Sequence, residues 1–334
     1  MPRAFITGCI SHALTPSERD FLRDTDPWGL ILFKRNVETP DQVRALVDSF
    51  RQIVGRDDAP VLIDQEGGRV QRLGPPHWPA YPAGGLFGKL HALDANAGLT
   101  AARLGARLIA EDLAALGITV DCLPVADVPQ AGSTQAIGNR AYGEDAATVA
   151  AIAGAVAEGL MEGGVLPVVK HMPGHGRAVV DSHEKLPVVE ADRATLSATD
   201  FAAFKPLNNL PLGMTGHIVF TDIDPDAPAT QSKTVIDDVI RREIGFTGAL
   251  MTDDLSMKAL AGDFAERTRA SLAAGCDLAL HCNGDMAEMI AVASAAPILA
   301  GEALRRTELA LDARKGPGTI DVAEARARFS AMIG

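Results

Sequence analysis

Short apolar runs alternate with longer amphipathic segments along the whole chain. Eight of these runs are aliphatic and show little apolar/polar alternation, as expected for parallel strands that are covered on both faces. They are Ala4–Thr7, Gly29–Phe33, Val61–Ile63, Thr119–Leu123, Leu166–Val169, Leu212–Thr215, Ala249–Met251 and Leu278–Leu280. The pattern therefore predicts eight short buried strands.

Helical patterns separate the predicted strands. Thr39 followed by Pro40 is typical of a helix start, with an N-cap and a proline at the first helical position. Gly245 and Gly275 follow helical segments, where glycine adopts the left-handed conformation of a C-cap without steric cost. The predicted helices are Pro40–Val54, Ala95–Leu116, Ala146–Met161, Thr195–Leu207, Val235–Ile244, Phe264–Ala274, Met286–Ala295, Ala300–Ala313 and Val322–Met332.

A strand followed by a helix, repeated eight times, is the order of a (β/α)₈ TIM barrel. The main alternative is an open doubly wound sheet, but no G-x-G-x-x-G or P-loop follows the first strand, which weakens its nucleotide-binding versions. No linker or second apolar core is evident, and the Pro/Gly-rich stretch 74–88 is interpreted as a long βα loop. We therefore predict an α/β fold with a single TIM-barrel catalytic domain spanning residues 1–334.

Composition and charge narrow the possible partners. The net charge is -12 and the basic residues form no run, so the chain is not suited to neutralising nucleic-acid phosphates. No apolar stretch is long enough for a signal peptide or a membrane span, so we expect a cytoplasmic protein, with monomer as the default. The four cysteines form no C-x-x-C pair; Cys276 and Cys282 are close enough in sequence to pair, but free thiols in a reducing compartment are the simpler interpretation.

Polar residues cluster directly after five of the predicted strands, in the stretches 64–69, 170–176, 216–217, 252–254 and 281–283. On a barrel these points share one rim, the face that carries active sites. Asp253 and Asp254 are adjacent, so their side chains point in different directions. We expect one carboxylate to face the barrel mouth and the other to cap the next helix or to form an ion pair.

A loop after the fifth strand carries Asp181-Ser182-His183, and Gly174 and Gly176 make its beginning conformationally permissive. In an extended stretch Asp181 and His183 point the same way, so Asp181 would hydrogen-bond one imidazole nitrogen and aim the other at a substrate. Taken alone, the triplet would favour an ordinary surface loop with a chance Asp-x-His. Asp64, Lys170 and His171 suit a ligand with several hydroxyls.

His171, His175, His183 and His217 with Asp253 are the candidate ligands for a metal site. Their spacings match no zinc signature, and Lys170 would oppose a cation. We therefore expect neither a metal nor another cofactor.

The run Lys170-His171-Met172-Pro173-Gly174-His175-Gly176, followed by Asp181-Ser182-His183, resembles the signature of glycoside hydrolase family 3. Within that family it resembles the bacterial β-N-acetylglucosaminidases of peptidoglycan recycling, although Met172 replaces the usual aromatic residue. The stretches 63–70, 137–140 and 252–257 agree in the expected order, so the resemblance covers nearly the whole chain.

The resemblance implies a role for individual residues. Asp253 matches the nucleophile, and His183 matches the acid/base, assisted by Asp181. The substrate-binding positions are matched by Asp64, Arg72, Arg140, Lys170 and His171. Family members use no metal in catalysis, and those with a second α/β domain take their acid/base from it; here we expect that domain to be absent and the His183 loop to replace it.

The implied activity is that of a retaining β-N-acetylhexosaminidase, which acts through a covalent glycosyl-enzyme. The implied small-molecule substrate is a 1,6-anhydro-N-acetylmuramoyl peptide of cell-wall recycling, a process tied to cell shape and division. Two alternatives remain: a glycoside phosphorylase with the same residues, and a sugar-binding protein without activity. Physical reasoning alone does not separate a hexosaminidase from a glucosidase, so that choice depends on the loop motif.

Overall fold

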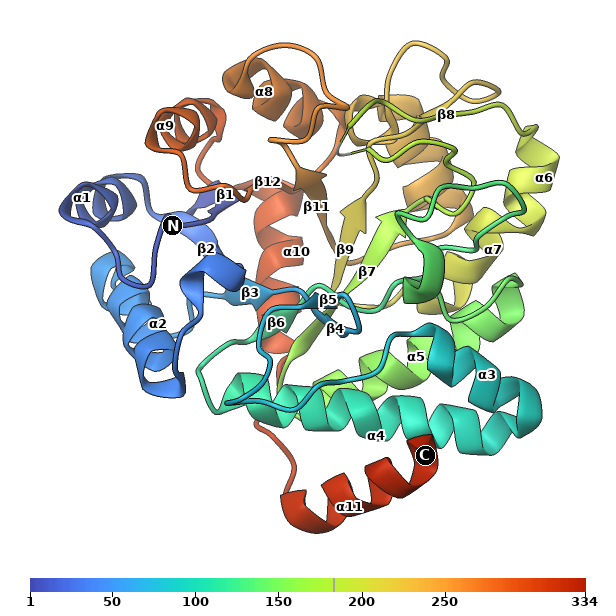
Figure 1. The fold of residues 1–334 in the computed structure, drawn as a ribbon. Helices are drawn as coiled ribbons and strands as arrows, with labels where there is room; N and C mark the ends of the chain where they lie inside the picture. Colours follow the sequence, from blue (N-terminus) through green and yellow to red (C-terminus); the bar gives the residue numbers. More distant parts are fainter. Residues whose placement is uncertain (183) are drawn as a thin grey trace.

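Eight parallel strands form a closed barrel in the computed structural model, which describes residues 1–182 and 184–334. Around the barrel the order is β1-β12-β11-β9-β7-β6-β3-β2 (Figure 1). The strands are β1 (Arg3–Thr7), β2 (Pro27–Leu32), β3 (Val61–Ile63), β6 (Val120–Asp121), β7 (Leu166–Met172), β9 (Leu212–Thr215), β11 (Ala249–Asp254) and β12 (Leu278–His281). All eight predicted strands, and the TIM-barrel fold, are confirmed.

Helices surround this barrel, and most lie where the sequence predicts them. They are α1 (Pro16–Thr25), α2 (Pro40–Val54), α3 (Gly85–Leu93), α4 (Ala95–Ala114), α5 (Ala146–Glu162), α6 (Arg193–Ala198), α7 (Asp200–Phe204), α8 (Phe264–Ala274), α9 (Met286–Ala295), α10 (Gly301–Asp312) and α11 (Val322–Ile333). The prediction of one continuous helix over Thr195–Leu207 is wrong, because the chain breaks at Thr199 and Pro206 lies in a final 3-10 turn, Lys205–Leu207. Val235–Glu243 is a π-type helix.

Two small sheets lie outside the barrel. β4 (Gln65–Gly67) and β5 (Val70–Gln71) form an antiparallel hairpin directly after β3, and β8 (Val188–Val189) pairs with β10 (Val219–Phe220). In the hairpin turn Gly67 has φ 92°, and a Cβ there would lie 2.2 Å from the Pro82 carbonyl oxygen. The stretch that the sequence presents as a polar loop is therefore a folded hairpin packed against the long βα loop.

The apolar core has two layers. Alternate strand residues such as Ile31, Leu62 and Met251 fill the barrel interior, while their neighbours pack outward against the helices. The connection into α10 and α10 itself supply Leu299 and Ala310 to the inner layer, which places them against the end of the barrel opposite the strand C-termini. Polar side chains are thus excluded from most of the barrel and concentrate at its open rim.

The last helix, α11, lies along α4 (Figure 1). Its Phe329 is 5% exposed and packs against Tyr81 and Phe87, and Gly105 of α4 leaves room for the ring because a Cβ there would lie 2.8 Å from it. Beside it Arg326 donates to Asp112 at 2.6 Å, and Tyr81 donates to the same carboxylate at 2.6 Å. The helix therefore supports the long loop that contains Tyr81.

Phe329→Ala is expected to lower the free energy of unfolding by about 3 kcal/mol, because it removes a buried ring and leaves a cavity over Gly105. Phe329→Leu, which keeps most of the apolar volume, is expected to cost less than half as much. Urea unfolding monitored by circular dichroism measures both values. Equal stability of Phe329→Ala and the parent would show that α11 does not pack as described.

Candidate active site

One pocket of about 270 Å³ opens at the carboxyl ends of the barrel strands. Every predicted site residue that the structure describes lines it, and these residues come from four strand ends and two loops. They are Asp64, Arg72, Arg140, Lys170, His171, Asp181 and Asp253. The predicted acid/base His183 lies outside the described residues.

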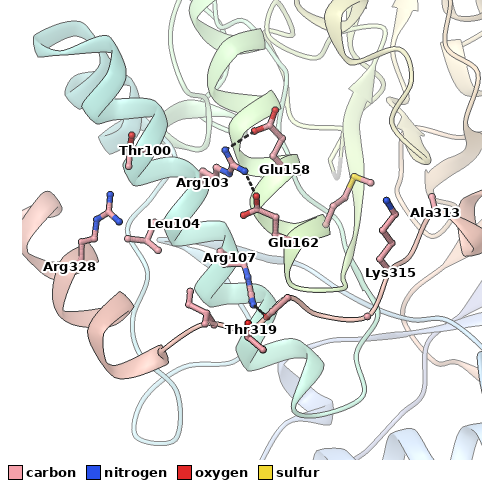
Figure 2. A pocket seen from close by; sticks show the side chains of 14 residues that line it. Thr100, Arg103, Leu104, Arg107, Glu158, Glu162, Ala313, Lys315, Thr319 and Arg328 are labelled. Carbon is pink, nitrogen blue, oxygen red and sulfur yellow. Dashed lines mark hydrogen bonds and ion pairs between the residues drawn. The ribbon is translucent and has the colours of Figure 1, made fainter.

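A larger groove of about 670 Å³ lies outside the barrel, between α4, α5 and the connection from α10 to α11 (Figure 2). Its most prominent polar feature is Arg103, which pairs with Glu158 and Glu162 across the two helices. None of the polar residues from the strand ends reaches this groove. Size alone therefore does not identify the site, and the smaller pocket at the barrel mouth is the candidate for chemistry.

A buried cation organises the floor of this pocket. The Lys170 Nζ lies 2.9 Å from Asp64 Oδ1 and 2.7 Å from Glu66 Oε1, and the lysine side chain is 2% exposed. Arg72 pairs with Asp64 at 3.0 Å, and Arg140 binds both oxygens of Glu66, at 2.7 and 2.8 Å. The predicted substrate-binding residues Asp64, Arg72, Arg140 and Lys170 therefore form one ion cluster, with Glu66 at its centre.

Ion pairing has a larger effect than burial on the pKa values of the two carboxyl groups in this cluster. Burial alone would raise the pKa of Asp64, but the charges of Lys170 and Arg72 lower it below its usual range. Burial likewise opposes ionisation of Glu66, yet Lys170 and Arg140 lower its pKa to about 2. Both carboxylates are therefore ionised at neutral pH, and their remaining lone pairs can accept hydrogen bonds from hydroxyls.

Asp127 orients the ring of His171. No role was assigned to Asp127 from the sequence. The His171 Nδ1 lies 2.7 Å from Asp127 Oδ2, and Asp127 Oδ1 accepts the His175 backbone N–H at 2.6 Å. Burial would raise the pKa of Asp127, but the two histidines lower it to about 2. The carboxylate thus fixes the ring of His171, leaving Nε2 as the nitrogen not committed to Asp127.

The two adjacent aspartates at the end of β11 have different surroundings. Asp254 accepts hydrogen bonds from the Ser256 backbone N–H and hydroxyl, at 3.0 and 2.5 Å, and from the Cys282 N–H at 3.1 Å. The expectation that one aspartate caps the next helix or forms an ion pair is wrong: Asp263 caps α8, and Asp254 ties the end of β11 to the end of β12. Asp253 lines the pocket and accepts its own neighbour's N–H at 2.8 Å.

The loop that begins at Gly174 is attached closely at its base. A Cβ on Gly176 would lie 2.0 Å from the Val128 carbonyl oxygen, so the backbone there fits only glycine. Arg177 donates to Asp200 at 2.6 Å, and the buried His175 Nε2 lies 3.1 Å from Ser182 Oγ. Asp181 and Ser182 both line the pocket, so the described part of the loop reaches the barrel mouth.

Four residues of the site were not assigned a role from the sequence: Glu66, Asp127, His175 and Ser182. Glu66 and His175 lie within the motif stretches, where their adjacency to Asp64 and His171 was the available signal. Asp127 follows the predicted fourth strand, and only the fold brings it under His171. In the part of the chain that is described, no three His, Cys, Asp or Glu side chains are arranged to hold a metal ion.

Comparison with known proteins identifies the family. Residues 9–308 match the glycosyl hydrolase family 3 N terminal domain. The chain belongs to glycoside hydrolase family 3. It is 34% identical to a β-hexosaminidase of Aromatoleum aromaticum over 89% of this chain and 83% of that protein, and 38% identical to one of Methylococcus capsulatus over 82% and 81%.

Solved structures of this family agree. The crystal structure of NagZ from Neisseria gonorrhoeae in complex with N-trifluoroacetyl-D-glucosamine matches with a TM-score of 0.90 and 31% identity, over 100% of this chain and 99% of that one. This family 3 chain is therefore a glycoside hydrolase of the β-hexosaminidase type. Its four cysteines are free and buried, and none of the helices described is long and apolar enough to cross a membrane.

Glu66→Gln is expected to raise KM about tenfold or more and to destabilise the fold by about 3 kcal/mol, because two buried cations lose a shared carboxylate. Glu162→Gln in the outer groove breaks a half-exposed ion pair and is expected to cost under ~1 kcal/mol without changing KM. Steady-state kinetics and urea unfolding of both variants give the comparison. A larger KM change in Glu162→Gln would move the site to the outer groove.

Asp121 lies buried below the ion cluster and accepts the Gln65 N–H at 2.9 Å. Desolvation is the main cause that raises its pKa to about 8, so this carboxyl is neutral in the folded protein. The pKa of Asp121 is higher in the folded than in the unfolded protein. Its contribution to the free energy of unfolding is therefore largest at low pH and declines as pH rises toward 8.

Asp121→Asn keeps a neutral acceptor and removes this decline. The free energy of unfolding of Asp121→Asn relative to the parent is expected to rise between pH 5 and 8, by at most about 1.4 kcal/mol per pH unit. Urea titrations at four pH values measure the difference. A difference that does not change with pH would show that Asp121 is ionised in the folded state.

Proposed function

We propose that this enzyme is a retaining β-N-acetylhexosaminidase that removes terminal β-linked N-acetylglucosamine through a covalent glycosyl-enzyme. The observation that carries the proposal is the pocket at the barrel mouth, whose lining contains Asp253, Asp181 of the loop and Lys170 with its ion cluster. The likeness to β-hexosaminidases and to a NagZ bound to an N-acylated glucosamine supports the choice of sugar.

Asp253 is proposed as the nucleophile. It ends a strand whose preceding residues Ala249–Thr252 are fully buried, so its backbone has little freedom to shift. Its neighbour Asp254 is committed to backbone and hydroxyl donors that tie β11 to β12, so Asp253 is the β11 carboxylate that we propose to meet the substrate. A carboxylate that is already held in place attacks the anomeric carbon with a lower barrier, because the entropy cost of orienting it is met in folding.

Asp181 and His183 are proposed as the acid/base pair on the loop. A retaining mechanism requires a group that first protonates the leaving oxygen and then removes a proton from water. An imidazole with an ordinary pKa near ~6.5 performs both steps near neutral pH. Asp181 already reaches the pocket, and a carboxylate beside an imidazole selects its tautomer and stabilises the charged form.

The ion cluster and His171 are proposed to bind the sugar hydroxyls. Ionised Asp64 accepts hydrogen bonds, while Lys170, Arg72, Arg140 and His171 donate them, and such directional contacts fix a polyhydroxylated ring. Phe33 adds an apolar surface at the pocket wall, with the guanidinium groups of Arg35 and Arg72 each 5.0 Å from its ring centre.

Hydrolysis is favoured over phosphorolysis by the charges around the pocket. Its described cations already face acceptors: Lys170, Arg72 and Arg140 face carboxylates, and Arg69 donates to carbonyl oxygens of the 135–137 segment. A phosphate acceptor would have to enter beside Asp181 and Asp253, and each lysine or arginine described at the pocket already faces another acceptor. Water carries no such penalty.

The natural substrate is proposed to be an N-acetylglucosaminyl-1,6-anhydro-N-acetylmuramoyl peptide released during cell-wall recycling. We propose that residues 1–334 act as one catalytic domain, without a metal, as a monomer in the cytoplasm. The supporting features are the near-complete coverage of NagZ by this chain and an acidic composition with four free thiols.

Asp253→Ala is expected to lower kcat by at least about 10⁴-fold on 4-nitrophenyl β-N-acetylglucosaminide, since the covalent step is lost. Release of nitrophenol measures the rate, and identifying the sugar product formed with and without phosphate separates hydrolysis from phosphorolysis. Near-parent turnover in Asp253→Ala would contradict the nucleophile assignment, and sugar 1-phosphate as the main product would contradict hydrolysis.

His183→Ala is expected to lose on the order of 10²–10⁴-fold in kcat/KM, which reports the first step, with a poor leaving group such as methylphenol, and far less with dinitrophenol. The reason is that an activated phenol needs no proton to leave. Asp181→Asn is compared with His183→Ala. Its loss of activity is expected to depend on the leaving group in the same way but to be smaller. Equal losses on both substrates would argue against an acid role for His183.

A further inference from the structure

His217 lies behind the nucleophile strand and has no part in the mechanism described so far. It follows β9, is 0% exposed and is not among the residues that line the pocket. Its Nε2 lies 3.1 Å from the Asp254 backbone carbonyl oxygen, and its Nδ1 lies 2.7 Å from the Thr230 hydroxyl. Thr230 is in turn 2.8 Å from the Thr215 hydroxyl, and both threonines are fully buried.

The proton positions along this chain of contacts follow from its two ends. A carbonyl oxygen only accepts hydrogen bonds, so the His217 Nε2 must carry the proton that points at Asp254. In a neutral ring Nδ1 then accepts, and the Thr230 hydroxyl donates to this nitrogen at 2.7 Å in preference to the Gly216 carbonyl oxygen, which lies 3.2 Å away. Thr230 can in that state accept from Thr215. The opposite tautomer would direct two lone pairs, of Nε2 and of the Asp254 oxygen, at each other.

The surroundings keep the ring neutral. Burial is the largest influence on His217 and lowers its pKa, which outweighs the nearby negative charge of Asp253. A neutral ring also fits both contacts of His217, because Nε2 can donate to the Asp254 carbonyl while Nδ1 accepts from Thr230. The imidazole therefore acts as a fixed donor on the β11 backbone.

We propose that His217 is a positioning residue for the nucleophile: the contacts Thr215–Thr230–His217 fix the Asp254 peptide and thereby the direction in which Asp253 points. This links the end of β9, the turn Ala229–Gln231 and the end of β11 at one buried point. Asp254 is also held by Ser256 and Cys282, so the residue after Asp253 is fixed both by its carbonyl and by its side chain. The inference rests on the proposed role of Asp253.

The test measures the attack step alone. The probe is a 5-fluoro-β-N-acetylglucosaminyl fluoride, whose anomeric carbon forms a bond to an Asp253 carboxylate oxygen as the C–F bond breaks and fluoride leaves. The second fluorine slows hydrolysis of the ester, so the labelled enzyme accumulates. Intact-protein mass spectrometry gives the labelling rate, and peptide mapping gives the labelled residue.

His217→Leu removes the donor, and its labelling rate at saturating probe is expected to fall on the order of 10- to 100-fold, as for a small misplacement of a reacting group. His217→Gln places an amide N–H near the position of Nε2 and is expected to stay within about threefold of the parent. KM for a nitrophenyl glycoside is expected to change less than twofold in both. A purely structural role would lower stability, but it would not lower the labelling rate while leaving KM unchanged. It would also give no reason for His217→Gln to restore the rate.

His281→Leu is the matched control, because His281 is another 0% exposed histidine at a strand end, but it contacts Glu288 instead of β11. Its labelling rate is expected to match the parent. If His217→Leu does not fold, Thr230→Val against Thr230→Ser tests the same chain of contacts. Loss of one neutral hydrogen bond predicts a fall of about 2- to 12-fold for valine and almost none for serine.

Three results would overturn the inference. These are labelling of His217→Leu, or of Thr230→Val where His217→Leu does not fold, at the parent rate; failure of His217→Gln to restore the rate; and an equal fall in His281→Leu. Labelling of a residue other than Asp253 in the parent would instead contradict the proposed function, and the positioning role would fall with it. Peptide mapping of the parent distinguishes the two failures.

Discussion

A lysine ammonium buried at the mouth of a barrel is the constraint on which this site depends. Removing such a charge from water costs several kcal/mol unless it is paired and fully hydrogen-bonded. Lys170 meets this requirement with Asp64 and Glu66, and each carboxylate then takes a second cation, Arg72 or Arg140. Because these residues come from β7, the β3–β4 segment, the end of β5 and the turn Gly138–Arg140, satisfying one charge fixes the positions of four chain segments.

At the end of β11 the rim is fixed by hydrogen bonds, without an ion pair to Asp254 among the described residues. The Asp254 carboxylate joins the ends of β11 and β12, and His217, from the end of β9, holds the carbonyl of the same residue. The sugar-binding side is thus held by charge pairing, and the nucleophile side by directional contacts to backbone. Between them lies the loop from Gly174, which is attached at Gly176 and Arg177 and then reaches into the pocket. A fixed floor with a separate loop suits chemistry that requires both precise attack and product release.

Much of this was predictable because barrel strands and their polar ends have strong local signals. Predicting Asp253 at the barrel mouth required only that Ala249–Met251 form a buried strand and that this strand end at the rim. The structure shows both. The helix break at Thr199 was not predictable, since Asp200 is committed to Arg177 of the site loop and not to the helical pattern. Glu66 and Asp127 also escaped assignment, because their partners Arg140 and His171 lie 74 and 44 residues away. Pairings of this kind depend on the fold, and local propensity carries no information about them.

The central claim is that the buried ion cluster and Asp253 face the same sugar. The most direct measurement is a crystal structure of Asp253→Asn with an intact β-N-acetylglucosaminide bound. The account predicts a sugar at the barrel mouth, with its hydroxyls within hydrogen-bond distance of Asp64 and Lys170 and its anomeric carbon facing residue 253. A sugar bound in the outer groove between α4 and α5, or one whose anomeric carbon points away from residue 253, would contradict it.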